Sequence, residues 1–214
     1  MRDSTRCGLN RLRAMKPALD EASAEMAIER GRFDAIRNGG PTVAVTAFNL
    51  FQTPESIAWK LAGMIPTGGR VLEPSAGLGR LLDAIERRAS PTELVAVEIA
   101  TQCASVLYAR ETCRLIQADF LTCDSERLGG LFDAVVMNPP FKMGTDIKHI
   151  EHAFKMLKPG GLLVALCFDG VKQNAKLKPW ADSWEVLPAE SFKAEGTLAG
   201  VCLLTKTKPF QPTT

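Results

Sequence analysis

From Val43 onward, strand-like and helix-like patterns of hydrophobic and polar positions alternate along this chain. Short apolar runs of the kind that forms buried strands occur at residues 70–73, 93–98, 114–118, 132–137 and 162–166. Amphipathic helical patterns separate them, at residues 78–89, in the residues up to Arg110, and at 147–157, where Lys158-Pro159-Gly160-Gly161 is a stop signal. Two more strand-like runs follow, at residues 184–187 and 199–204. This alternation predicts a parallel α/β sheet with its ligand chemistry at the strand C-termini.

A different pattern precedes the sheet. Residues 9–38 read as a helix that ends at Gly39-Gly40-Pro41, with apolar side chains repeated every seven residues at Leu12, Leu19, Met26 and Phe33. The stripe predicts packing against the chain's own domain; a homodimer seam is the alternative. We therefore expect a helical extension over residues 1–41, a main domain over 42–208 and a tail over 209–214.

Composition limits the class of protein. The 214 residues are 46% hydrophobic and 23% charged, enough for a full core. No apolar run approaches membrane-spanning length and no signal-peptide pattern follows Met1, so a soluble, cytoplasmic protein without a membrane partner is expected. The six cysteines include no C-x-x-C pair. His149 and His152 could share a helix face, but a third ligand is not evident, so we expect no metal.

The most specific motif is Asn138-Pro139-Pro140-Phe141, which follows the apolar run at residues 132–137. Two consecutive prolines fix φ and remove two backbone donors. The carbonyl groups of Asn138 and Pro139 are then held in place without a neighbouring N–H to compete for them. This turn suits a site that grips an amino group through its hydrogens, with an aromatic ring alongside.

A glycine-containing loop, Glu73-Pro74-Ser75-Ala76-Gly77-Leu78-Gly79, joins the first strand to its helix. Its glycines allow a tight turn and the close approach of a ligand. Ser75 stands where a G-x-G-x-x-G motif has its first glycine, which weakens a phosphate-binding interpretation. Glu98 ends the next strand, 19 residues after Gly79. A carboxylate there can accept hydrogen bonds from both hydroxyls of a ribose. The glycine loop and Glu98 together therefore indicate a nucleoside site.

Two shorter signals are weak by themselves. Asp119-Phe120 ends the third strand. The Asp119 carboxylate could accept a hydrogen bond from an adenine amino group, and the Phe120 ring could lie against the base. In Phe51-Gln52-Thr53-Pro54-Glu55, Thr53 is a good N-cap and Pro54 a good first helical residue. A helix N-terminus that faces the sheet edge could also bind a carboxylate.

The order of these motifs resembles that of the S-adenosylmethionine-dependent N6-adenine DNA methyltransferases of the gamma class, especially the small stand-alone enzymes of phages and mobile elements. The resemblance spans residues 48–206. It implies a Rossmann-like class I methyltransferase fold: a mostly parallel seven-stranded sheet with an antiparallel C-terminal strand, here preceded by an N-terminal helix. It also implies methyl transfer from S-adenosylmethionine to the N6 amino group of adenine in DNA. Two alternatives stay open: adenine in RNA or a glutamine side chain as substrate, and a non-catalytic binding module.

The resemblance also implies roles for the site residues. Thr53 and residues 73–79 would hold the methionine part of the cofactor, Glu98 its ribose, and Asp119-Phe120 its adenine. The expected cofactor-binding residues are Phe51, Gln52, Thr53, Pro54, Glu73, Pro74, Ser75, Ala76, Gly77, Gly79, Glu98, Ile99, Asp119, Phe120 and Asn138. The expected catalytic residues are Asn138, Pro139, Pro140 and Phe141. Asn138 and the Pro139 carbonyl would accept the target amino hydrogens, and Phe141 would stack on a base turned out of the helix.

The distribution of charge along the chain indicates what kind of partner it binds. The net charge is only +2, but residues 142–178 hold seven lysines against Asp146, Glu151 and Asp169. Positive charge beside the Asn-Pro-Pro-Phe turn suits a polyanion, and a solubilising surface explains it equally well. We expect a nucleic-acid partner, DNA before RNA, with residues 142–146 and 169–184 around the substrate mouth.

Overall fold

The computed structural model describes residues 52–210. The helix predicted at residues 9–38, the dimer seam considered on it, the boundary at residue 41 and Phe51 lie outside the described residues. The boundary predicted before the tail at residue 209 stays a prediction. Within the described residues, no helix is long and apolar enough to cross a membrane.

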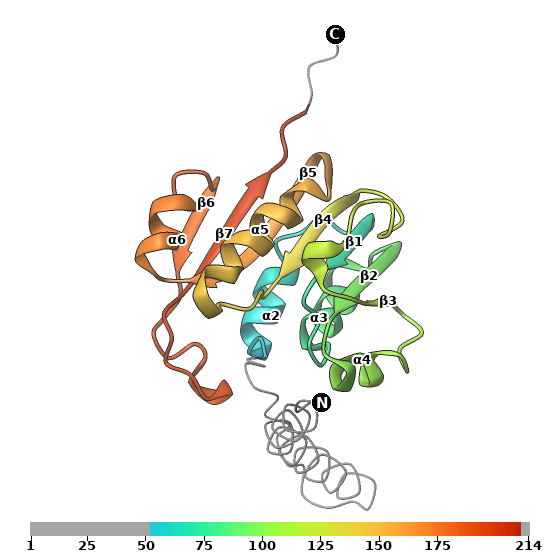
Figure 1. Ribbon diagram of the computed structural model, residues 1–214, viewed down its shortest axis with the longest axis horizontal. Coiled ribbons are helices and arrows are strands. Elements are labelled where there is room, and N and C mark those ends of the chain that lie inside the picture. Colours follow the sequence, from blue (N-terminus) through green and yellow to red (C-terminus); the bar gives the residue numbers. More distant parts are fainter. Residues whose placement is uncertain (1–51, 211–214) are drawn as a thin grey trace, which may run out of the picture. The chain divides into compact units, whose positions relative to one another are not determined.

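Seven strands of the described chain form one sheet in the order β3-β2-β1-β4-β5-β7-β6 (Figure 1). Their bounds are β1 Arg70–Glu73, β2 Glu93–Glu98, β3 Arg114–Gln117, β4 Phe132–Met137, β5 Leu157–Phe168, β6 Ser183–Val186 and β7 Val201–Thr207. Strand β7 is antiparallel to both of its neighbours, and the other neighbouring pairs are parallel. The predicted fold class is therefore confirmed, including the antiparallel C-terminal strand.

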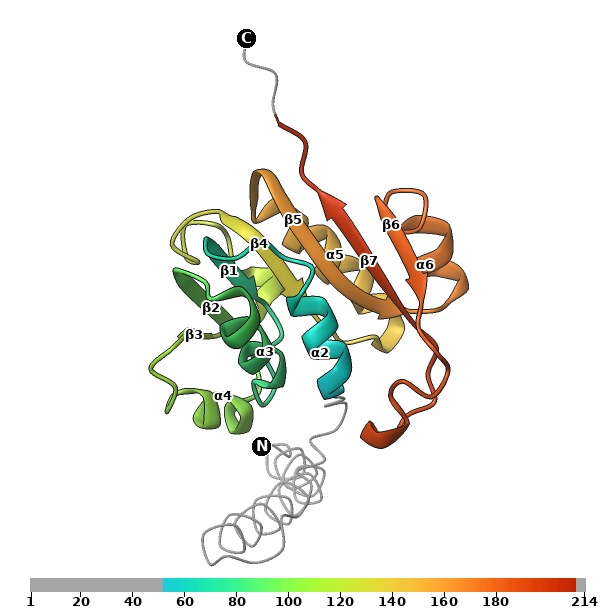
Figure 2. The same ribbon diagram turned by 180° about the vertical axis from the view of Figure 1, so that it is seen from behind.

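Helices cover both faces of the sheet. The helices are α2 Glu55–Ala62, α3 Arg80–Ala89, α4 Thr101–Leu107, α5 Thr145–Lys155 and α6 Val171–Lys176, with 3-10 turns η1 Phe120–Thr122, η2 Lys142–Gly144 and η3 Lys193–Glu195. Helix α5 lies in front of the sheet in Figure 1, and α2 and α3 lie in front of it in the reverse view of Figure 2. Leu61 and Ile85 belong to the buried cluster on one face, and Phe120 and Ile150 to the cluster on the other.

The largest departure from the predicted elements is at the start of β5. The structure ends α5 at Lys155 and includes residues 158–161, expected as a helix-stop turn, in the strand. Strand β4 pairs Phe132 with Leu157 but Ala134 with Leu162, so β5 bulges between the two pairs. Gly160, at φ 80°, allows this bulge, and its N–H donates to the Lys208 carbonyl at 2.7 Å. Residues 158–161, which the sequence indicated as a helix-stop turn, therefore form a bulge in strand β5.

The sheet topology decides where a ligand can bind. Strands β1 and β4 are neighbours, while β2 and β3 extend from β1 in one direction and β5 from β4 in the other. The order of the strands thus reverses between β1 and β4. In open α/β sheets, ligands bind beyond the C-terminal ends of the strands at such a reversal. Residues 74–79 follow β1 and residues 138–141 follow β4, so both motifs flank this point.

Candidate active site

The glycine loop after β1 has the backbone that its sequence predicted. Gly77 and Gly79 have φ values of 54° and 87°, in the left-handed region that favours glycine. A Cβ on Gly79 would lie 2.8 Å from Cδ2 of the buried Leu107. Glycine is thus required at position 79 by both space and dihedral angle, and it places the loop tightly against α4.

Glu98 joins the loop to the end of β2. The Gly77 N–H donates to Glu98 Oε2 at 2.7 Å, and the Ala100 N–H donates to Oε1 at 2.7 Å. The sequence suggested a ligand role for Glu98; the structure shows in addition that its carboxylate fixes the glycine loop. An ionised carboxylate has about four acceptor positions, so both oxygens keep one for a ribose hydroxyl.

Buried acceptors without partners line the same loop. Glu73 is 1% exposed, and neither its Oε2 atom nor Ser75 Oγ has a hydrogen-bond partner within residues 52–210. Burial, assisted by the neighbouring Glu98 carboxylate, raises the pKa of Glu73 well above its usual range. Unsatisfied buried acceptors call for a ligand or solvent donor. Left-handed glycines, a carboxylate for hydroxyls and buried acceptors for a cation together fit S-adenosylmethionine.

The segment before α2 also reaches this loop. Thr53 is buried, and its carbonyl accepts a hydrogen bond from Arg80 Nη1 at 3.1 Å. The predicted cap is wrong in detail: α2 begins at Glu55, with Pro54 as the N-cap and no side-chain cap bond. Pro54 has an extended ψ of 144°, so it cannot be the first helical residue. Gln52 is half-buried.

The end of β3 differs from the expected adenine site. Asp119 is exposed and caps η1, since its Oδ1 accepts from the Leu121 N–H at 2.9 Å. The Phe120 ring is 2% exposed and packs edge-on against His152, with 4.8 Å between centroids. The expectation that this ring lies against a ligand base is therefore wrong, because apolar burial turns it into the core. Ile99, 66% exposed beside Glu98, offers an apolar surface instead.

His149 and His152 both lie among packed side chains and backbone groups of the folded core. His152 Nε2 lies 2.7 Å from the Cys123 carbonyl oxygen, to which it donates. Burial lowers the pKa of His149 and favours its neutral form. Among residues 52–210 there is no group of three or more His, Cys, Asp or Glu side chains that could hold a metal ion.

The Asn-Pro-Pro-Phe turn follows β4 directly. Asn138 is half-buried, Pro139 is buried, and the partly buried Phe141 packs against the cluster under α2 and α3. The turn lies beside the glycine loop because β1 and β4 are hydrogen-bonded neighbours. The structure thus brings together the two predicted halves of the site, 59 to 68 residues apart in the sequence.

Asp146 is a site-forming residue that the sequence did not reveal. It is fully buried in the first turn of α5 and accepts from the Phe168 N–H and from Gln173 Nε2, each at 3.0 Å. These bonds join the segment after Phe141 to the end of β5 and to α6. An acid in the first turn of a helix was the only signal, and it does not identify a partner.

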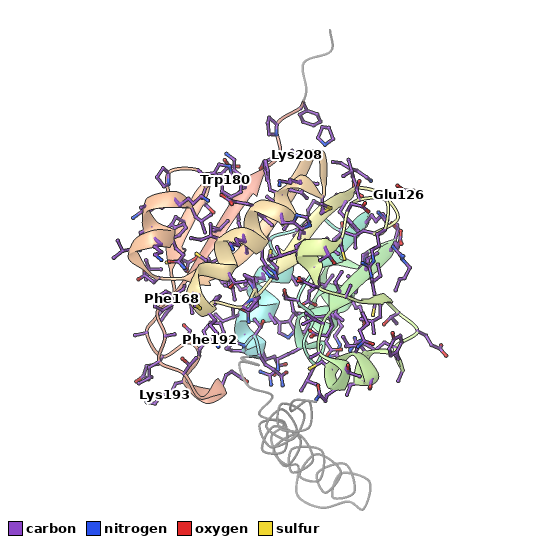
Figure 3. All side chains as sticks on the ribbon, viewed as in Figure 1. Glu126, Phe168, Trp180, Phe192, Lys193 and Lys208 are labelled. Carbon is purple, nitrogen blue, oxygen red and sulfur yellow. The ribbon has the colours of Figure 1, made fainter. Side chains whose placement is uncertain are left out.

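Arg80 and Glu195 were also missed. The Arg80 guanidinium forms an ion pair with Glu195, which belongs to the long β6–β7 connection, residues 187–200. Phe192 anchors this connection, with 2% of its surface exposed. Phe168 and Phe192 lie at the same end of the sheet, away from Lys208 (Figure 3). The connection therefore borders the predicted site.

A sheet of this order, with a glycine loop after β1 and an acid at the end of β2, is the arrangement of the class I methyltransferase fold. Residues 59–191 match the methyltransferase small domain family. The chain belongs to that family.

Two curated relatives share part of the sequence. An rRNA N(6)-adenosine-methyltransferase, metl-5 of Caenorhabditis elegans, is 30% identical over 103 residues, which are 44% of this chain and 45% of the relative. A probable ribosomal RNA small subunit methyltransferase A of Methanosarcina mazei is 36% identical over 92 residues, 40% of this chain and 32% of the relative. The match therefore spans less than half the length of either relative.

Solved structures share the fold. A methyltransferase from Pyrococcus furiosus superposes with a TM-score of 0.57 at 20% identity, over 88% of this chain and all of that one. TrmN from Thermus thermophilus gives 0.53 at 18% identity, over 72% of this chain and 48% of that one. At these identities the likeness concerns the fold alone.

Proposed function

We propose that this protein transfers the methyl group of S-adenosylmethionine to the N6 amino group of adenine in a nucleic acid. The observation that carries the proposal is the turn Asn138–Phe141 at the end of β4, beside the glycine loop at the end of β1. A rigid pair of acceptors next to a cofactor loop suits a planar amino group as the methyl acceptor.

The chemistry follows from the residues of the turn. S-adenosylmethionine, when bound, supplies a methyl group activated by a sulfonium. An aromatic amino group is a poor nucleophile, because its lone pair is delocalised into the ring. The Asn138 side-chain oxygen and the Pro139 carbonyl accept hydrogen bonds from its two N–H groups and draw the nitrogen toward tetrahedral geometry, while Phe141 stacks on the base. Positioning and electrostatics therefore supply the rate. Once methylated, the nitrogen is cationic and acidic and releases its proton to solvent, so no general base is needed.

The cofactor is assigned to the loop side of the site. Glu73 and Ser75 offer buried acceptors to the cationic amino-acid end, and Glu98 offers its remaining acceptor positions to the ribose. Ile99 supplies an exposed apolar surface for the adenine ring. Asp119 remains the proposed acceptor for the adenine amino group.

The polymer that carries the adenine has two candidates. RNA is supported by the relatives, whose names describe ribosomal RNA methylation and, in one case, adenosine N6. DNA is supported by the motif order, whereas Phe141 favours a nucleic acid of either kind. A glutamine side chain is less well supported, since exposed lysines favour a polyanion.

The direct experiment incubates the protein with labelled cofactor and, separately, duplex DNA, single-stranded DNA, RNA and protein extract. The products are digested and the methylated residue is identified by mass spectrometry. We expect N6-methyladenine in one nucleic acid. Its absence from every nucleic-acid digest would contradict the proposal.

Asn138→Ala is the variant that tests the chemistry. We expect transfer to fall about 10²- to 10³-fold, the cost of removing one group that stabilises a transition state. Calorimetry should show little change in cofactor affinity. A parallel loss of cofactor binding would assign Asn138 to the cofactor rather than to the target amino group.

A further inference from the structure

Three segments meet at the end of β5, next to the Asn-Pro-Pro-Phe turn. Asp146 accepts hydrogen bonds from the Phe168 N–H and from Gln173, as described above. The Asp169 N–H donates to the Gly200 carbonyl at 2.8 Å. Residues 142–146, 168–173 and 198–200 therefore form one continuous edge, which we call the rim.

Exposed apolar side chains gather on the rim. Large hydrophobic residues are exposed there by 92% at Met143, 88% at Val171, 71% at Leu198 and 37% at Phe168. Single exposed hydrophobic residues are common on soluble proteins. Four on three bonded segments beside a candidate active site indicate a binding surface.

Met143 has an unusual backbone. Its φ of 55° and ψ of 24° lie in the left-handed region, which only one other non-glycine residue within residues 52–210, Ser90, also enters at positive φ. Glycine would adopt this conformation without strain. A large apolar side chain kept there, two residues after Phe141, is consistent with a role in binding.

The two charged side chains that the rim exposes fully are lysines. Lys142 and Lys172 are exposed and form no ion pair in the part of the chain that the structure describes. The acids of the rim are engaged: Asp146 is buried, and Asp169 Oδ1 accepts from Asn174 at 2.7 Å. The rim therefore presents apolar side chains between two exposed lysines, while its two acids are buried or half-buried.

We propose that the rim docks an unpaired nucleic-acid strand, with Met143 against the face of the base next to the target adenine. Lys142 and Lys172 contact the flanking phosphates. An unpaired strand exposes the apolar faces of its bases, whereas a duplex stacks them inside. This inference rests on the proposed function and adds the strand state of the substrate and the residues that select it.

Met143→Gly tests the contact without straining the fold. The probe is a short fluorescent oligonucleotide with a central adenine, as DNA and as RNA, each single-stranded and as a blunt duplex. Anisotropy is read with S-adenosylhomocysteine present, so that no transfer occurs. We expect the variant to bind the single strands about tenfold more weakly, the loss of one apolar contact between the Met143 side chain and a base. Met143→Leu should retain binding, and the thermal midpoint and cofactor affinity of Met143→Gly should equal those of the wild type.

The lysines are tested through salt. Lys142→Ala and Lys172→Ala should each lower the slope of log affinity against log salt by about 0.7, the value for one phosphate of a single strand. Lys155→Ala is the matched control, since this exposed lysine stands at the far end of α5. Its slope should equal that of the wild type.

The outcomes separate the two proposals. Equal affinity for strand and duplex, no binding of any oligonucleotide, or unchanged binding by Met143→Gly would overturn the rim proposal, even if N6-methyladenine is formed. Strand binding that depends on Met143, with no N6-methyladenine in any digest, would overturn the proposed function alone. The DNA and RNA arms decide which polymer is preferred.

Discussion

The carboxyl group of Glu73 sits at the end of β1, fully enclosed, with an oxygen that has no partner in residues 52–210. Because burial raises its pKa, the folded chain holds this proton more tightly than the unfolded chain does. Stability is then lost as pH rises from the ordinary glutamate pKa through the raised one. At neutral pH the buried Glu73 carboxyl therefore lowers the free energy of unfolding. Its proposed role is to bind a cationic ligand.

Glu73→Gln should separate the effect of Glu73 on stability from its effect on cofactor binding. We expect its thermal midpoint at neutral pH to exceed that of the wild type by a few degrees. Below the ordinary glutamate pKa of about 4.3, the two midpoints should converge. Thermal unfolding followed by circular dichroism across pH measures the difference, with Glu126→Gln, an exposed loop glutamate, as the control.

Cofactor binding supplies a second measurement on the same variant. A bound cation favours the Glu73 carboxylate, so binding should release a proton and weaken as pH falls. Calorimetry in buffers of different ionisation enthalpy counts this proton. Proton release that persists in Glu73→Gln would assign it to another group.

Among the elements, the β6–β7 connection depends on few contacts. It spans residues 187–200, far longer than most hairpin loops, and its middle is held by the buried Phe192 and by the Arg80–Glu195 ion pair. Arg80 also donates to the Thr53 carbonyl. One guanidinium thus links the segment before α2, the start of α3 and the connection.

A double-mutant cycle with Arg80→Ala and Glu195→Ala should give a coupling free energy of about 1 kcal/mol, measured by urea unfolding. Lys193 and Glu190, an exposed pair on the same connection, form the control cycle. Their coupling should be about 0–0.5 kcal/mol, because solvent screens exposed pairs. Equal couplings would mean that Arg80 and Glu195 do not hold the connection.

At the scale of the whole molecule, stability should be distributed by position in the sheet. Strands β1 and β4 are central and buried on both faces, whereas the edge strands β3 and β6 are half exposed. Hydrogen exchange should therefore be at least about tenfold faster in β3 and β6 than in β1 and β4. S-adenosylmethionine should slow exchange at Gly77 and Ala100, whose N–H groups donate to Glu98. Uniform protection would contradict this picture.

Most of the strands and helices could be predicted from local patterns in the sequence. The predicted runs at 70–73, 93–98 and 132–137 coincide with β1, β2 and β4, because buried parallel strands are continuous apolar runs with clear ends. Helix α6 was missed because its six residues are too few for a recognisable period. The bulge in β5 was missed because Pro-Gly-Gly signals a turn unless a neighbouring strand accommodates it.

By itself, the sequence determined the alternating strands and helices, the tight glycine loop and the rigid Asn138–Phe141 turn, since each follows from short-range sterics and periodicity. Only the tertiary structure decided that Glu98 holds Gly77, that Phe120 packs into the core, and that Asp146 and Arg80 join distant segments. Those outcomes depend on which strands become neighbours and on which side chains are desolvated. Neither property is local, because both arise when the whole sheet assembles.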